Sequence, residues 1–228
     1  MKAPGSNVMH QPLFHLVRRS VLSMSEKPPL LVLLHGYGSN EEDLFGIEKA
    51  FDPNFLVVSV RAPVILNRGS YAWFSIDFTP EGSIPQMEEF EKSRQALLDF
   101  IDWAILEYQA DSSQVILAGF SQGAMMCGAL AFFAPEKCKA SVLMSGRLLP
   151  KVLTDRVSTD RLKKTSFLVI HGTQDQVLPL SDGQKIHDTL SSLGIAHTYQ
   201  EFPMPHTISD ESLSFATTWI SRQITKIS

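Results

Sequence analysis

The chain of 228 residues has little cysteine and no long apolar stretch. Its two cysteines, Cys127 and Cys138, are too few for a disulfide framework, which favours a reducing compartment. The longest aliphatic run covers residues 30–34, whereas a membrane helix needs roughly 20 apolar residues. No apolar segment follows the early lysine at the N-terminus, as a secretory signal would require. We therefore expect a soluble, cytoplasmic protein without a transmembrane segment.

The sequence also lacks a concentration of charge of one sign. It has 20 basic and 24 acidic residues, which give a formal net charge of −4. Because phosphate backbones are bound by clustered lysines and arginines, no nucleic-acid partner is expected. The sequence contains no H-E-x-x-H motif and no Cys/His cluster at metal-ligand spacing, so we expect no metal and no cofactor.

Short apolar runs that alternate with longer helical patterns indicate the fold class. The runs cover residues 30–34, 55–60, 114–118, 140–144 and 167–170. Because they are apolar at nearly every position, they predict strands buried on both faces, as in a mostly parallel α/β sheet with helices on both faces. A further strand is expected at 198–202, and an antiparallel edge strand within 13–21.

Helices are expected between these strands. The clearest pattern covers about 86–108, and shorter helices are expected at 180–193 and 213–224. Ser39 or Asn40 is expected to cap another helix, whose first turn is acidic. No repeat or linker divides the chain, so we interpret residues 1–25 as an N-terminal extension of one domain that continues over 26–228.

Residues 119–123 read G-F-S-Q-G, a G-x-S-x-G pattern. An expected strand leads into this pattern, and a helical segment of small residues leads out. Such a turn is so sharp that its serine takes strained backbone angles and raises its hydroxyl above the sheet. The alternative is that Ser121 only caps the helix, while Gly119 and Gly123 only pack. The strand–turn–helix context favours Ser121 as a nucleophile.

A serine nucleophile requires an oriented base. In α/β-hydrolases the chain order is serine, acid and histidine, each on a loop that follows a strand. Among the seven histidines only His206 meets both conditions, because it lies in a proline-rich loop between an expected strand and the final helix. His187 falls inside an expected helix and His197 opens an expected strand, so we interpret both as structural.

The acid is expected on the loop after the strand at 167–170. Asp175 lies on this loop, between Ser121 and His206 in chain order. Asp182 is its rival, but it falls at the start of an expected helix, where capping explains it. Asp175 as a simple turn former is the other reading; its place after a strand favours the catalytic one.

An oxyanion hole requires two backbone N–H groups that point at the developing negative charge. Residues 34–38 read L-H-G-Y-G and follow the first buried strand, where this fold supplies one donor. We assign the N–H groups of Tyr37 and Gln122. A dinucleotide-binding loop is excluded because its third glycine would fall at Glu41.

These motifs together resemble the phospholipase/carboxylesterase family of serine hydrolases, which includes acyl-protein thioesterases and small bacterial carboxylesterases. The resemblance rests on residues 34–38, 119–123, the H-G-T-Q-D-Q-V-L-P segment at 171–179, and His206. It implies an α/β-hydrolase fold without a large cap domain and ester or thioester hydrolysis without a metal. It also implies that Ser121, Asp175 and His206 form a catalytic triad.

Two features bear on the substrate. Trp73 and Phe74 resemble the family's segment beside the acyl site, although packing of a loop explains these aromatic residues equally well. Arg147 follows another strand and is a candidate contact for an acidic substrate group, although a solvated arginine is the simpler interpretation.

The expected function is hydrolysis of carboxylic esters, thioesters or lysophospholipids through an acyl-enzyme intermediate. The alternatives are a peptidase or lactonase with the same triad, or a catalytically inactive binding module. The sequence leaves open the acyl chain length and whether the chain is a monomer or a homodimer.

Overall fold

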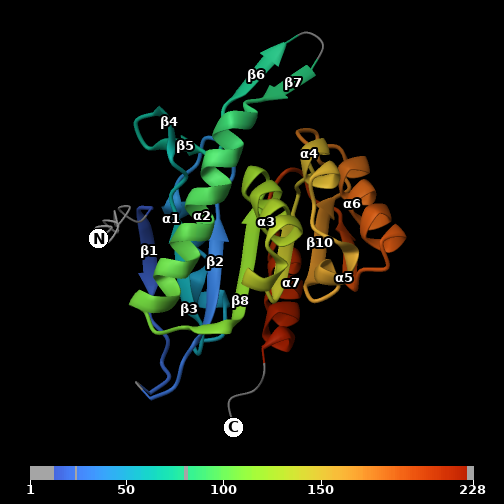
Figure 1. Ribbon diagram of the computed structural model, residues 1–228. Coiled ribbons are helices and arrows are strands. Elements are labelled where there is room, and N and C mark those ends of the chain that lie inside the picture. The colour runs from blue at the N-terminus through green and yellow to red at the C-terminus, as the bar shows by residue number, and fades with distance from the viewer. Residues whose placement is uncertain (1–12, 24, 80–81, 225–228) are drawn as a thin grey trace, which may run out of the picture.

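Seven strands form the central sheet. They are β1 (His15–Arg18), β2 (Pro29–Leu34), β3 (Leu56–Val60), β8 (Asp111–Phe120), β9 (Ala140–Met144), β10 (Ser166–Gly172) and β11 (His197–Phe202). The computed structural model describes residues 13–23, 25–79 and 82–224. The strand order is β1-β3-β2-β8-β9-β10-β11 (Figure 1). Every neighbouring pair is parallel except β1 with β3, so the carboxyl ends of six strands meet at one edge.

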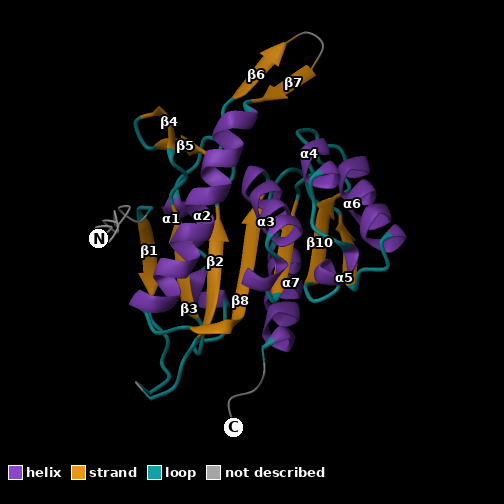
Figure 2. Cartoon of the chain, viewed as in Figure 1, coloured by secondary structure: helices purple, strands orange, loops and turns teal. Residues whose placement is uncertain are grey.

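Helices cover both faces of this sheet (Figure 2). They are α1 (Glu41–Phe45), α2 (Met87–Glu107), α3 (Gln122–Phe133), α4 (Pro150–Thr154), α5 (Thr159–Leu162), α6 (Leu180–Ser192) and α7 (Asp210–Gln223). A hydrophobic core lies on each face of the sheet. Alternate residues of β2 belong to different cores, because successive side chains of a strand point to opposite faces. Leu30, Val32 and Leu34 pack with α2 and α3, whereas Leu31 and Leu33 pack with α1 and α7.

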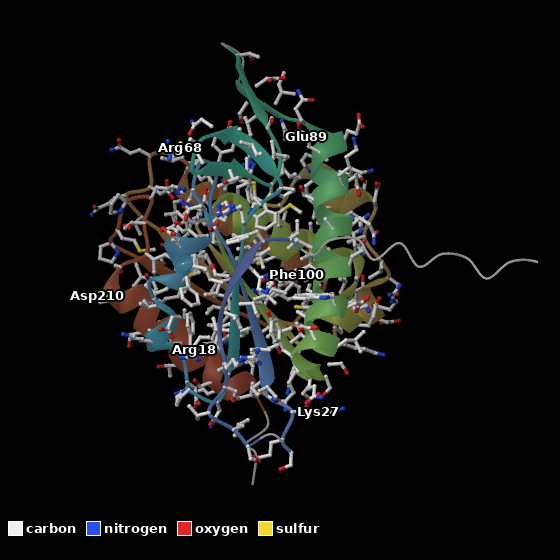
Figure 3. The ribbon with its side chains drawn as sticks, turned by 90° about the vertical axis from the view of Figure 1, so that its left-hand side faces the viewer. Arg18, Lys27, Arg68, Glu89, Phe100 and Asp210 are labelled. Atoms are coloured by element: carbon white, nitrogen blue, oxygen red, sulfur yellow. The ribbon has the colours of Figure 1, made fainter. Side chains whose placement is uncertain are left out.

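The strands expected from apolar runs are confirmed, and the expected edge strand is β1. Arg18 of β1, labelled in Figure 3, is half-buried. It donates hydrogen bonds to the carbonyl oxygens of Glu48, Phe51, Asp52 and Phe55, at 2.8–3.3 Å. These bonds fasten the edge strand to the segment before β3. Residues 1–12 and 24 of the expected N-terminal extension lie outside the described residues, and its boundary at residue 25 stays a prediction.

The long helices lie close to their expected positions, and their ends have local causes. The N-cap of α1 is Asn40, whose Oδ1 accepts a hydrogen bond from the Glu42 N–H. The last helix, α7, begins three residues earlier than expected because Ser209 caps it through the Ser212 N–H. Gly194 follows α6 with a φ of 63°, a left-handed conformation that glycine adopts without strain.

Two hairpins between β3 and α2 were not expected. They pair β4 (Val64–Asn67) with β5 (Ser70–Ala72), and β6 (Ile76–Thr79) with β7 (Gly82–Pro85). Both stand at the end of the molecule toward which the parallel strands point (Figure 1). Their short, partly exposed strands carry no clear apolar alternation, which is why their sequence gives little signal.

Backbone contact fixes how α3 sits on the sheet. A Cβ atom on Gly123 would lie 1.9 Å from the carbonyl oxygen of Leu34, and one on Gly119 would lie 2.4 Å from the carbonyl carbon of Gly123. Only glycines allow the first turn of α3 to approach the ends of β2 and β8 this closely. The two glycines of the G-x-S-x-G pattern are therefore packing requirements of the turn.

We predict that Gly123→Ala lowers the free energy of unfolding by at least about 3 kcal/mol, because rigid backbone must move. Gly128→Ala, in the same helix, is the matched control, since its new methyl group would meet side-chain ends and no backbone: Leu148 Cδ2 at 2.8 Å and Leu143 in ordinary contact at 3.8 Å. We expect the control to change stability by no more than about 1 kcal/mol. Urea unfolding measures both variants, and wild-type stability for Gly123→Ala would contradict the packing described.

Candidate active site

Ser121 occupies the turn between β8 and α3 in a strained conformation. Its φ is 54° and its ψ is −116°, a region that non-glycine residues rarely adopt. Its N–H donates a hydrogen bond to the carbonyl oxygen of Met144, the last residue of the neighbouring strand, at 2.9 Å. The turn is thus fixed by a hydrogen bond to β9, in addition to the close backbone packing that its glycines allow.

His206 reaches Ser121 from the loop between β11 and α7. The distance between His206 Nε2 and Ser121 Oγ is 2.9 Å. Two backbone hydrogen bonds tie the His206 loop to the loop after β10: the Gln174 N–H donates to the oxygen of Met204 at 3.1 Å, and the Thr173 N–H to that of Phe202 at 2.8 Å. The loops that carry the expected acid and the expected base are therefore one connected unit.

Asp175 is buried and uses both of its carboxylate oxygens. Oδ2 lies 2.6 Å from His206 Nδ1, and Oδ1 accepts hydrogen bonds from the N–H groups of Val177 and Leu178, both at 2.9 Å. An ionised carboxylate only accepts, so His206 carries its proton on Nδ1 and presents Nε2 as an acceptor toward Ser121. The structure thus brings together the three residues that the sequence selected.

His171 has a supporting position that the sequence analysis did not assign. It is fully buried, its Nε2 donates to the carbonyl oxygen of Leu178 at 2.9 Å, and the same nitrogen lies 3.6 Å from Asp175 Oδ2. His171 thereby holds the loop whose N–H groups bind the Asp175 carboxylate. Its place in the H-G-x-x-D segment, directly after the strand expected at 167–170, was the available signal; in the structure His171 lies within β10.

The rival acid, Asp182, lies in the first turn of α6. The N-cap position is Pro179, so the expected capping role is wrong in detail. The Asp182 carboxylate lies 3.6 Å from Lys185 Nζ. Its negative charge also interacts favourably with the positive, N-terminal end of the helix dipole. It is not hydrogen-bonded to His206, whose Nδ1 partner is Asp175.

The loop after β2 lies against Ser121. A Cβ atom on Gly36 would be 3.4 Å from Ser121 Cβ, so the peptide leading to Tyr37 adjoins the serine. The neighbouring His35 donates from Nδ1 to the carbonyl oxygen of Gly36 at 2.7 Å and accepts the Ala62 N–H on Nε2 at 3.1 Å. Burial lowers the pKa of His35, which agrees with a neutral ring that must accept a hydrogen bond.

The side chain of Gln122 fastens the segment before the second hairpin. Its Oε1 accepts the Trp73 N–H at 2.8 Å, and its Nε2 donates to the carbonyl oxygen of Phe74 at 2.7 Å. Trp73 and Phe74 are fully buried, and the indole N–H of Trp73 donates to the carbonyl oxygen of His35 at 2.9 Å. Of the two interpretations of these aromatic residues, the structure therefore supports packing beneath the site.

Arg147 lies on the loop after β9, where it lines a pocket of about 550 Å³. Its Nη2 donates to Ser83 Oγ at 3.2 Å, which links this loop to β7.

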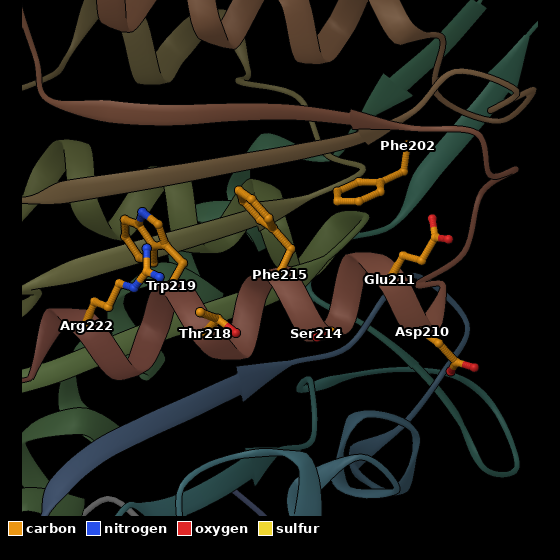
Figure 4. A pocket seen from close by; sticks show the side chains of 8 residues that line it. All are labelled: Phe202, Asp210, Glu211, Ser214, Phe215, Thr218, Trp219 and Arg222. Carbon is orange, nitrogen blue, oxygen red and sulfur yellow. The ribbon is translucent and has the colours of Figure 1, made fainter.

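A second pocket, of about 630 Å³, runs along α7 (Figure 4). It is lined by Phe202, Asp210, Glu211, Ser214, Phe215, Thr218, Trp219 and Arg222 and contains none of the residues around Ser121.

Three further features concern the described parts of the chain. No group of three or more His, Cys, Asp or Glu residues there could hold a metal ion, and no helix there is long and apolar enough to cross a membrane. Burial raises the pKa of the Cys127 thiol well above its usual value and that of Cys138 to about 12. Neither thiol is therefore an activated nucleophile.

Comparison with known proteins agrees with this geometry. The sequence profile of the family described as Phospholipase/Carboxylesterase matches residues 19–224. The chain belongs to this family. Solved structures that resemble it include the esterase PE8 (TM-score 0.79, 26% identity, 94% of this chain and 100% of the other). The Bacillus cereus carboxylesterase is also similar (TM-score 0.79, 25% identity, 96% and 97% covered), and the fold is that of an α/β-hydrolase.

Curated relatives are hydrolases by name. The putative hydrolase MhqD of Bacillus subtilis is 33% identical over 114 residues, which are 50% of this chain and 55% of that protein. The match thus spans about half the length of each. Acyl-protein thioesterase 1 of Gibberella zeae is 25% identical over 206 residues, with 83% of this chain and 85% of that protein covered. A rice relative, 27% identical over 214 residues (88% of this chain and 86% of that protein), is named a probable inactive carboxylesterase.

The buried His35 predicts a pH dependence of stability. Because its folded-state pKa lies below the ordinary 6.5, the unfolded chain gains a proton first as the pH falls. The contribution of His35 to the free energy of unfolding is complete above pH 6.5 and is lost as the pH falls toward the lower, folded-state pKa. At pH 5.5 the free energy of unfolding is reduced by up to about 1.4 kcal/mol. Urea unfolding at pH 7.5 and 5.5 should show a smaller decrease for His35→Gln than for the wild type. Equal decreases would contradict a buried neutral His35.

Proposed function

We propose that the protein is a serine hydrolase that cleaves carboxylic esters or thioesters through an acyl-enzyme intermediate on Ser121. The observation that carries this proposal is the hydrogen-bonded series from Asp175 through His206 to Ser121, with distances of 2.6 and 2.9 Å. Family membership supports it, since relatives are named carboxylesterases and an acyl-protein thioesterase.

The proposed reaction has two halves. Ser121 Oγ attacks the substrate carbonyl carbon while His206 Nε2 takes its proton, and Asp175 stabilises the imidazolium that forms. The N–H groups of Tyr37 and Gln122 stabilise the oxyanion. His206 then protonates the departing alcohol or thiol, and Ser121 is left as an ester of the acyl group. In the second half His206 activates water, which releases the carboxylic acid and restores Ser121.

Structural features also bear on the alternatives. An inactive binding module would need neither the strained backbone of Ser121 nor a carboxylate whose two oxygens are both engaged, so we favour an active enzyme. The relatives' names favour an ester or thioester over the peptide bond of a peptidase or the cyclic ester of a lactonase. We further propose that the enzyme works in the cytoplasm, in agreement with its two free, buried cysteines. A homodimer stays a prediction.

We predict that Ser121→Ala reduces kcat for p-nitrophenyl butyrate by about 10⁴- to 10⁶-fold, because the nucleophile is lost. Ser145→Ala is the matched control. Ser145 follows the adjacent strand, is buried and also has a positive φ of 49°, yet its hydroxyl has no hydrogen-bond partner among the described residues. We expect that control to stay within about tenfold of the wild type. Near-normal hydrolysis by Ser121→Ala would overturn the proposed function.

A further inference from the structure

The pocket that contains Arg147 has walls from two parts of the chain. One wall is β7 with the start of α2, and it contributes Ile84, Pro85 and Met87; the other is the segment after β9, and it contributes Arg147, Leu148 and Leu149. The volume of about 550 Å³ lies within the usual range for ligand pockets. Five of these six side chains are apolar, the exception being Arg147; Ser83, Pro150 and Lys151 complete the lining.

The segment after β9 connects the lining of this pocket to Ser121, which does not itself line the pocket. The Ser121 N–H is bonded to the carbonyl oxygen of Met144, and Arg147 follows Met144 by three residues. Three residues span at most about 11 Å even when fully extended. The connection bends toward the serine, because a Cβ atom on Gly146 would lie 3.3 Å from the Ser121 carbonyl oxygen. Arg147 is therefore within the length of a small substrate from the nucleophile.

The opposite wall is also fastened to the site. Gln122, the residue after Ser121, holds the backbone of Trp73 and Phe74 through its side chain. The next residue, Ser75, accepts the Gln86 N–H at 2.9 Å on its carbonyl oxygen, which closes the base of the β6–β7 hairpin at the start of α2. Both walls of the pocket are thus connected to residues that flank the nucleophile.

No carboxylate of the described residues neutralises the charge of Arg147. In the described residues no carboxylate lies within 4.0 Å of its guanidinium, and its contact is the neutral Ser83 hydroxyl. Its Nε is buried and has no partner there. By contrast, Lys151 at the same pocket lies 2.5 Å from Asp155 and 3.7 Å from Glu91. The pocket therefore combines apolar walls with one uncompensated guanidinium.

We propose that Arg147 determines substrate specificity by binding an anionic oxygen group, a carboxylate or a phosphate, that the substrate carries beyond an apolar segment. A guanidinium matches the geometry of both groups with paired N–H donors, and burial of the Nε–H strengthens the preference for an anion. The apolar segment would occupy the walls formed by Ile84, Met87 and Leu149. This inference rests on the proposed function, because it concerns the substrate of the same site.

The test compares two esters of equal chain length, p-nitrophenyl octanoate and the p-nitrophenyl monoester of suberic acid, whose far end is a carboxylate. We expect Arg147→Gln to lower kcat/KM for the suberate ester by about 10- to 100-fold and for the octanoate by less than about threefold. Arg147→Lys should restore part of the loss. Arg156→Gln is the matched control, because Arg156 contacts Val157 and Thr159 and does not line the pocket.

Octyl phosphate and octanoate, tested as competitive inhibitors, identify whether the group is a phosphate or a carboxylate; the preferred one should bind about tenfold more weakly to Arg147→Gln. Equal losses on both esters, or no loss on the suberate ester together with unchanged inhibition, would overturn the role of Arg147. Failure of the proposed function gives a different result: the wild type hydrolyses neither ester, or Ser121→Ala hydrolyses the octanoate as the wild type does.

Discussion

The close approach of the first turn of α3 to the ends of β2 and β8 is the constraint on which the rest of the site depends. With the backbone of Gly123 against the carbonyl oxygen of Leu34, the chain has no room for a relaxed turn. Ser121 therefore takes a positive φ, which raises its side chain above the sheet edge. The loop after β2 also lies against Ser121, since a Cβ atom on Gly36 would be 3.4 Å from Ser121 Cβ, and α3 begins at the next residue, Gln122.

The parallel sheet brings the remaining groups to this point. The strands β2, β8, β9, β10 and β11 end at the same edge, and each is followed by a loop that contributes to the site. Two buried histidines stabilise these loops through hydrogen bonds: His35 holds the loop after β2, and His171 holds the loop that binds Asp175. The loops of the site are thus held by hydrogen bonds from buried side chains to the backbone, as a preorganised catalytic centre requires.

Much of this arrangement is readable in the sequence because it is local. Strands buried on both faces are apolar at nearly every position, and the order of Ser121, Asp175 and His206 follows the strand ends. What the sequence could not supply depends on contacts between distant segments. The side chain of Gln122 forms hydrogen bonds with the backbone of Trp73 and Phe74, which lie 49 and 48 residues away in the sequence. No local sequence pattern near either segment predicts this contact. The capping role expected for Asp182 was wrong because α6 begins at Leu180, which places Asp182 inside the first turn, and the N-cap, Pro179, makes no side-chain capping bond.

The central claim is that Ser121 is a nucleophile activated by His206 and Asp175. The most direct measurement is reaction with a fluorophosphonate, followed by peptide mass spectrometry of the labelled protein. We expect one adduct per chain, located on Ser121, with ester hydrolysis lost in proportion to labelling and no adduct in the His206→Ala protein. An unmodified Ser121 in a protein that still hydrolyses esters, or an adduct on another residue, would contradict it.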